Sequence, residues 1–225
     1  DALFAAAHLF EGHGAAPMWR EAGRQLFDSM RKQYRLSDGY FASAIDHHGA
    51  IDVPNISVGW ILNVYPWRFL DDEERKMVIS PIVRRLFSNE FLTPIGLRTR
   101  SVVTSDPVPG VVDYHGSETV WPMFTFMVIE GLRKHRLYDL ARELEHRLIT
   151  AYNAIPGFQE FYVISRAGIT LLPQTRSAPR CDVQRLPEQQ IAFSVVPAMV
   201  LAHRQIAPPS MPEPATWQRQ LEEEV

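Results

Sequence analysis

The sequence has little of three things that define whole classes of protein. Its one cysteine, Cys181, cannot form a disulfide within the chain and fits a reducing compartment. It has no unbroken apolar run of about 18 residues, so no membrane span is expected. Charge of one sign is not in excess either, because 23 Lys and Arg against 26 Asp and Glu give a net charge of −3. This balance offers no basic footprint for nucleic acid or an anionic membrane. With no signal peptide pattern at its start, the chain is expected to be cytoplasmic.

Motifs for metals and cofactors are also missing. A single cysteine excludes a thiolate zinc site. His8 and His13 lack the i, i+4 spacing of a helical metal pair, and the adjacent His47 and His48 would point in different directions in regular structure. There is no nucleophile elbow and no phosphate-binding glycine loop. The sequence therefore predicts neither a metal nor a cofactor.

What the chain does have is an ordinary globular composition and a strong helical rhythm. Its 225 residues are 46% apolar and 22% charged, which is enough for a real core. Apolar positions predict helices of two kinds, since some segments are apolar on all sides and others on one side only. The first kind comprises 58–65, 120–132 and 191–203, and the second comprises 17–35, 71–88 and 137–152. A helix that is apolar all round needs protein on every side. We therefore expect an all-α fold with about six or seven helices in two layers, as in an α/α barrel.

Two long loops and a distinct tail complete the predicted organisation. Residues 91–119 and 155–188 have no sustained period, and loops of this length in compact domains are often functional. We expect a partial barrel domain over residues 1–206. A Pro-rich and acidic tail follows over 207–225, ending in a short helix at 216–224 or in disorder.

The two loops carry the residues that could do chemistry. Glu118 and Glu160 are flanked by aromatic side chains such as Trp121 and Phe161, and Arg98 and His115 are nearby in sequence. A glycoside-cleaving pocket needs such a set, because aromatic faces pack on sugar rings, donors hold hydroxyls and a carboxylate activates water. Composition alone favours a simpler interpretation, in which both glutamates are surface acids and Trp121 belongs to the core.

The order of several short motifs instead favours the glycoside-cleaving interpretation of these residues. The chain resembles the catalytic domain of glycogen-debranching enzymes of the amylo-α-1,6-glucosidase type, which are inverting glycosidases built on an (α/α)6 barrel. The matching stretches occur in family order and are Gly39-Tyr40-Phe41 with Asp46, Val53-Pro54-Asn55, Leu92 to Thr99, Tyr114-His115-Gly116 with Thr119-Val120-Trp121-Pro122, Gln159-Glu160-Phe161, and Gln190 to Ser194. The resemblance implies a glycoside hydrolase that cleaves α-glucosidic bonds in glycogen-like or oligosaccharide substrates.

The resemblance also implies roles for individual residues. Glu160 stands at the place of the family's general base, which deprotonates the attacking water. Tyr114, His115 and Trp121 would line the subsite for the terminal sugar. Arg98 and Asn55 would act there as donors or as organisers of the loops. Glu118 is a rival acid, because Ser117 and Glu118 are inserted relative to the family pattern.

The family's general acid has no counterpart in this chain. The resemblance places it upstream of Asp1, so this chain is expected to be the C-terminal half of an (α/α)6 barrel. Its expected partners are a carbohydrate and either the missing N-terminal half of the barrel or a second copy. If the chain is truncated, the apolar helices at 120–132 and 191–203 would be partly exposed.

Two other hypotheses remain open. One is a non-catalytic α/α module that binds carbohydrate or a protein partner, which the missing acid favours. The other is a phosphorylase on the same barrel, which would need a phosphate site, whereas the basic residues are scattered along the sequence.

Overall fold

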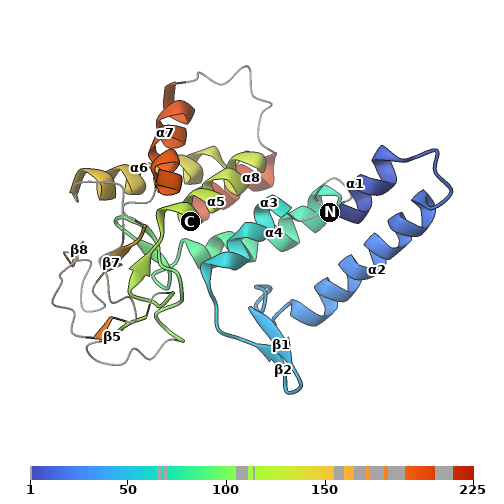
Figure 1. Cartoon of the computed structure of the whole chain (residues 1–225), viewed down its shortest axis with the longest axis horizontal. Coiled ribbons are helices and arrows are strands. Elements are labelled where there is room, and N and C mark those ends of the chain that lie inside the picture. The colour runs from blue at the N-terminus through green and yellow to red at the C-terminus, as the bar shows by residue number, and fades with distance from the viewer. Residues whose placement is uncertain are drawn as a thin grey trace.

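A computed structural model describes residues 2–64, 67, 70–104, 111–113, 115–154, 160–164, 171–172, 180–181, 191–205 and 215–225. This part of the chain is mainly helical (Figure 1). Its helices are α1 (Ala2–Leu9), α2 (Ala16–Tyr34), the 3-10 helix η1 (Ile56–Trp60), α3 (Ile61–Val64), α4 (Asp72–Leu86), α5 (Pro122–Lys134), α6 (Tyr138–Ala154), α7 (Ile191–Gln205) and α8 (Thr216–Glu224). None of these helices is long and apolar enough to cross a membrane.

The strands are only two or three residues long and serve as ties between loops. They are β1 (Ala44–Asp46), β2 (Gly49–Ile51), β3 (Leu92–Thr93), β4 (Gly96–Leu97), β5 (Val111–Val112), β6 (Thr119–Val120), β7 (Tyr162–Ile164), β8 (Leu171–Leu172) and β9 (Arg180–Cys181). β1–β2 and β3–β4 are antiparallel hairpins, β5 pairs in parallel with β9, and β6, β7 and β8 form a three-stranded antiparallel sheet.

The helix boundaries follow from local sequence signals. Asp71 caps α4 by accepting a hydrogen bond from the Glu74 amide at 2.8 Å, and the Glu74 carboxylate accepts one from the Asp71 amide at 3.3 Å. This reciprocal pair satisfies amide groups that the first helical turn leaves unpaired. α2 and α5 begin with Pro17 and Pro122, whose fixed φ suits the first turn. The predicted starts of α2 and α4 are confirmed to within one residue, whereas α5 begins two residues later than the segment 120–132 predicted, because Thr119 and Val120 form β6.

Helix α5 lies at the centre of the described core. It packs against η1 and α3 on one side and against α6 and α7 on others. Its buried residues cover most of its circumference and are Pro122, Thr125, Phe126, Val128, Ile129, Gly131 and Leu132. α4 and α6 instead bury one face each, as the one-sided patterns at 71–88 and 137–152 predicted. The prediction of an inner and an outer layer is thereby confirmed for these helices.

The first inner segment differs from its prediction. Residues 58–65 were expected to form one buried helix, but Ile56–Trp60 is a 3-10 turn and only Ile61–Val64 is α-helical. Asn55 caps the 3-10 turn by accepting a hydrogen bond from the Ser57 amide at 2.9 Å. Val64 is largely exposed, so protein does not surround this apolar segment along its whole length. The close approach of Gly59 to Leu86 and Val128 is what holds the tighter turn in the core.

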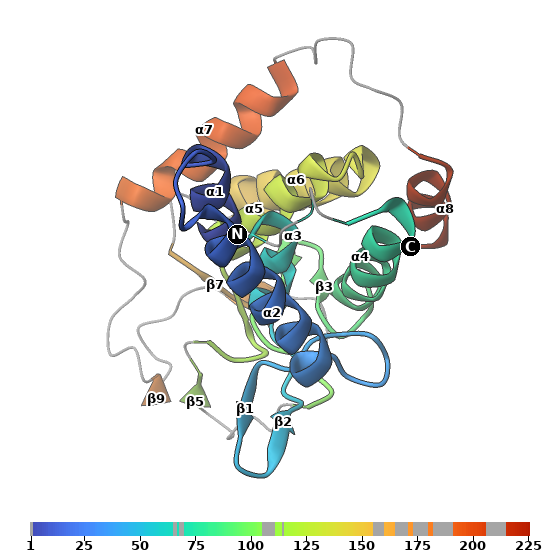
Figure 2. The same cartoon turned by 90° about the vertical axis from the view of Figure 1, so that its right-hand side faces the viewer.

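Helices α1 and α2 form a hairpin that projects away from the rest of the chain (Figure 1) and faces the viewer in Figure 2. Only the C-terminal part of α2, with Phe27, Met30 and Tyr34, packs on the main core. Leu9, Phe10, Met18 and Leu26 are exposed on the projecting part. On α7, Val195, Met199 and Leu201 are exposed, as expected for the segment 191–203. On α5 the exposure is smaller, because η1, α3, α6 and α7 pack against it, and Met123, Phe124 and Met127 are only partly exposed.

Charged side chains fix α7 to α5 and α6. The carboxylate of Glu145, on α6, is 1% exposed and lies 3.3 Å from Arg133 and 3.4 Å from His203. His203 also lies 3.2 Å from Glu130 on α5. A buried carboxylate is stable only when cations compensate it, and here Arg133 comes from α5 and Arg204, 3.7 Å away, from α7. Glu145 thus ties three helices together.

Helix α8 docks at the C-terminal end of α5. Gln218 donates a hydrogen bond to the backbone carbonyl of His135, and Leu221 is buried in the main core. Arg84, on α4, contacts Glu224 at 2.5 Å, and the Asp139 amide donates to Glu222 at 2.8 Å. The helix expected at 216–224 is confirmed, and it belongs to the same core as α4 and α5.

The docking of α8 encloses His135, which predicts a pH dependence of stability. The ring is buried, its Nε2 donates to the Leu62 carbonyl at 2.9 Å, and burial lowers its pKa from 6.5 to about 4. Between these two pKa values the histidine is protonated in the unfolded chain and neutral in the folded chain. The free energy of unfolding therefore falls as the pH falls from 6.5 towards 4. Between pH 7 and pH 5 we expect this histidine to remove about 2 kcal/mol of the free energy of unfolding.

Urea denaturation at pH 7 and pH 5 measures this effect. His135→Gln keeps a donor for the Leu62 carbonyl and should lose most of the decline, whereas the variant His146→Gln, at an exposed position, should keep it. An equal decline in both variants would show that other groups cause it.

Candidate functional site

The β6–β7 ladder brings the two long loops together. Thr119 pairs with Val163 and Val120 with Tyr162, in antiparallel register. Continued by one step, this register sets Trp121 opposite Phe161, and their rings lie 5.5 Å apart, nearly parallel. Glu160 directly precedes Phe161 in the chain. Glu160 is partly buried at this junction.

An aromatic stack extends from this junction along the start of α5. Trp121 lies between Phe161 and Phe124, whose ring centroid is 5.0 Å from its own at an interplanar angle of 11°. His115 stacks on Trp121 at 4.9 Å and on Phe124 at 5.8 Å. Trp60, from η1, meets Phe124 edge-on at 5.1 Å. Trp60, His115, Trp121, Phe124 and Phe161 are called the aromatic stack below.

Burial decides which members of the aromatic stack a ligand can touch. Trp121 is 4% exposed and Phe161 1%, so both serve as the floor. His115 is exposed, and Phe124 and Trp60 are partly exposed. Flat aromatic faces of this kind pack well on apolar faces of rings. The faces open to a ligand therefore belong to His115, Phe124 and Trp60, and Trp121 packs behind His115 and Phe124.

Phe124 and Trp60 were missed by the sequence reasoning. Phe124 follows Trp121 by three residues at the start of α5, which is a spacing that brings side chains together on a helix. This signal was present but fits a core residue equally well. Trp60 carried no such signal, because only the contact between η1 and α5 brings it to the aromatic stack.

Arg98 organises the loop that carries the aromatic stack. It is 6% exposed and donates to the Ser117 carbonyl at 2.6 Å. Nearby, the Thr99 amide donates to the Thr119 carbonyl at 2.9 Å, and the two threonine hydroxyls are 3.1 Å apart. These contacts tie the early part of the first long loop to its end. Arg98 thus fixes the backbone of this loop, and its expected role towards a sugar stays a prediction.

Asn55 likewise holds backbone in place. Its side chain caps η1 through Ser57 and donates to the Ser43 hydroxyl at 2.6 Å. Its carbonyl accepts a hydrogen bond from Tyr40, and burial raises the pKa of Tyr40 well above its usual range. A protonated Tyr40 is thus a permanent donor to this turn. Tyr114, also expected in the sugar subsite, lies outside the described residues.

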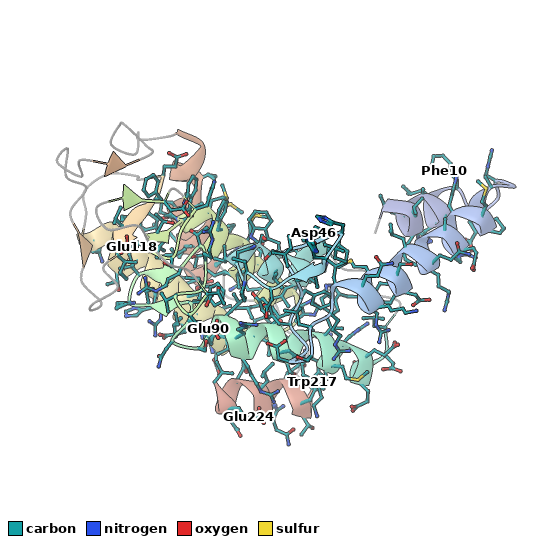
Figure 3. The ribbon with its side chains drawn as sticks, turned by 90° about the horizontal axis from the view of Figure 1, so that it is seen from below. Phe10, Asp46, Glu90, Glu118, Trp217 and Glu224 are labelled. Atoms are coloured by element: carbon teal, nitrogen blue, oxygen red, sulfur yellow. The ribbon has the colours of Figure 1, made fainter. Side chains whose placement is uncertain are left out.

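Glu118 and Glu160 sit at opposite ends of the β6–β7 ladder. The Glu118 carbonyl accepts a hydrogen bond from the Ile164 amide at 2.8 Å, so Glu118 is level with Ile164. Glu160 is four residues away along β7, which corresponds to about 13 Å of extended backbone. An inverting pair of carboxyl groups lies about 6.5–9.5 Å apart. The ladder thus separates Glu118 from Glu160 instead of pairing them. Figure 3 shows Glu118 at the strand end of the molecule.

The layer beneath the ladder is apolar and uncharged. Tyr162 packs with Val120, Ile95, Ala151 and Ile164 in a small separate core. Burial raises the pKa of Tyr162 above its usual range, so the phenol stays protonated at neutral pH. Among the described residues, no group of three His, Cys, Asp or Glu side chains could hold a metal ion.

Comparison with solved structures assigns this architecture to a class. The chain has the fold of part of an (α/α)6 barrel, as the helix rhythm predicted. One similar solved structure is neutral trehalase Nth1 from Saccharomyces cerevisiae, with a TM-score of 0.58 and 15% sequence identity over 93% of this chain. The chain spans about a third of the trehalase, 33% of its length. No protein-family model and no curated protein sequence matches the chain.

Proposed function

We propose that the protein is a glycoside hydrolase. The observation that carries the proposal is the partly exposed aromatic stack, which lies beside a partly buried carboxylate, Glu160, at the start of an inner barrel helix. The similarity to a trehalase supports the same class of substrate, since a trehalase also acts on a sugar. The expected substrates are α-glucosidic oligosaccharides or glycogen-like polysaccharides, as the debranching-type motifs imply.

In this proposal Glu160 is the general base. It removes a proton from a water molecule, which attacks the anomeric carbon on the face opposite to the leaving group, so the anomeric configuration inverts. The sugar ring rests on His115 and the partly exposed faces of Phe124 and Trp60. Arg98 keeps the loop of His115 in position through the Ser117 carbonyl. The second carboxyl group, the general acid, is proposed to come from a segment before Asp1, as the resemblance implies.

An assay of hydrolysis on different substrates distinguishes the proposed function from its alternatives. The full-length protein should release glucose from an α-1,6-branched dextrin, and the anomer first released, observed by NMR, should be the inverted one. Release of glucose from trehalose alone would still show a glycoside hydrolase, but it would overturn the debranching specificity. Binding of oligosaccharide without hydrolysis would overturn the enzyme and favour a carbohydrate-binding module.

His115→Ala tests direct contact between the aromatic stack and the sugar. His115 is the exposed member, so its loss should leave the buried floor of Trp121 and Phe161 in place. Stacking of this kind contributes about 1 kcal/mol, so we expect the dissociation constant for an α-glucosidic oligosaccharide to rise about fivefold. Titration calorimetry measures it, with the exposed His146→Ala as the matched control. Equal affinities in both variants would remove His115 from the site.

A further inference from the structure

A cavity of about 280 Å³ lies where α4, α5 and α8 meet. Three cationic residues line it: Arg75 from α4, and Lys134 and Arg136 from the end of α5. One carboxylate, Asp72, is also present, but its side chain is 71% exposed and lies 3.8 Å from Arg75. An exposed pair at this distance is weak. The lining of the cavity therefore has a positive formal charge.

The walls of the cavity are firmly built. Arg75 donates through Nε to the Trp67 carbonyl at 3.1 Å, and this hydrogen bond fixes the position of its guanidinium group. Lys134 donates to the Asn63 carbonyl at 2.6 Å, using one of three ammonium donors. Two buried polar residues, His135 and Gln218, form the back wall and are joined by a hydrogen bond. Arg75 and Lys134 are thus each held by a backbone carbonyl from the segment that precedes α4.

Helix α8 adds a further donor. The indole Nε1 of Trp217 is buried and has no acceptor among the described residues, and Trp217 lines the cavity. An indole N–H can only donate, so the group that satisfies it must carry an acceptor. His135 is neutral near pH 7, because burial lowers its pKa to about 4, so the positive charge comes from the three cations.

The backbone of Arg136 gives a second indication. Its φ is +60°, in the left-handed region at the end of α5, and it is the one non-glycine residue with positive φ in the described chain. Glycine is the preferred residue at such a helix end. An arginine here accepts backbone strain and sets its side chain at the cavity.

We propose that this cavity binds a phosphate group, either as free phosphate or as the phosphate of a small monoester. Guanidinium groups and an ammonium are the side chains that proteins use for phosphate, and the indole N–H would supply one more hydrogen bond. The volume is at the small end of ligand sites, which suits a small molecule and not a polyanion. Free phosphate and a monoester would both be bound through the same phosphate group.

The site is separate from the candidate sugar site. Lys134 ends α5 and Pro122 begins it, so the 13 residues of the helix hold the two sites about 20 Å apart. In Figure 3, Trp217 on α8 lies well away from Glu118, which belongs to the loop that carries His115. Bound phosphate would therefore not react there. It would join α4, α5 and α8 and stabilise the folded chain.

Titration calorimetry and thermal melts of the full chain test the proposal with two probes, inorganic phosphate and glycerol phosphate. We expect a dissociation constant in the millimolar range or below for at least one probe, and a rise in melting temperature beyond that given by chloride at equal ionic strength. Lys134→Gln and Arg136→Gly should each weaken binding about tenfold. Arg24→Gln removes an exposed arginine on α2 and should leave the affinity unchanged.

Arg136→Gly separates binding from folding. Glycine adopts a φ of +60° without strain, so this variant should keep the stability of the folded chain and lose only the affinity. Tighter binding of glycerol phosphate than of phosphate would assign the monoester, and the reverse would assign the free ion. No binding of either probe, or equal binding by the Arg136→Gly and Arg24→Gln variants, overturns the proposal.

Discussion

Glu160→Gln in the full-length protein is expected to lower kcat for hydrolysis of an α-glucosidic substrate about 1,000-fold. The amide keeps the shape of the side chain but cannot take a proton from the attacking water. Since Glu160 is only partly buried and the aromatic stack is untouched, sugar affinity should change little. The loss should therefore fall on kcat and leave KM nearly constant.

Glu118→Gln is the matched control for this experiment. Glu118 lies about 13 Å along the ladder from Glu160, level with Ile164, so its variant should keep most of the activity. If Glu118→Gln is the inactive variant instead, the two glutamates exchange roles. Near-normal turnover of Glu160→Gln removes it as the base, and absence of turnover in the unaltered protein removes the proposed function itself.

Gly131→Val is expected to lower the free energy of unfolding by at least about 3 kcal/mol. Gly131 is where α5 crosses α3, and a Cβ atom placed on it would lie 2.4 Å from the Cβ of Leu62. Neither atom can turn away, because both are attached directly to helical backbone. The two helices must separate, and the core that surrounds Leu62 and Leu132 must open with them.

Urea denaturation at neutral pH measures this loss. Gly12→Val is the control, since nothing lies within 4 Å of a Cβ at Gly12 and its φ is not positive. That change should stay within about 0.5 kcal/mol. A similar stability for both variants would mean that α3 and α5 are not closely packed at Gly131.

Much of the fold follows from local sequence. Asp71 and Glu74 mark the start of α4, Pro17 and Pro122 mark two others, and the all-round apolar pattern of 120–132 identifies α5 as the inner helix. These signals act within one or two turns, so a single sequence contains them. The segment 58–65 shows the limit, because its short turn depends on Gly59 fitting between Leu86 and Val128 of other helices.

The candidate site was predicted less completely. The motifs drew attention to His115, Trp121 and Glu160, and the β6–β7 ladder brings their segments together. The motifs could not show that Trp121 is buried, that Arg98 is used by the Ser117 carbonyl, or that Trp60 joins Phe124. Each of these depends on contacts between residues far apart in the chain.

The basic cavity lay beyond the sequence altogether. The residues that line it are scattered along the chain. Arg75 lies almost 60 residues before Lys134, and Trp217 lies about 80 residues after Lys134. By itself, the sequence determined a helical, part-barrel chain and named a carboxylate with aromatic neighbours. Only the tertiary structure decided which of these side chains face one another, because periodicity fixes the face of a helix that is buried but not the partner that buries it.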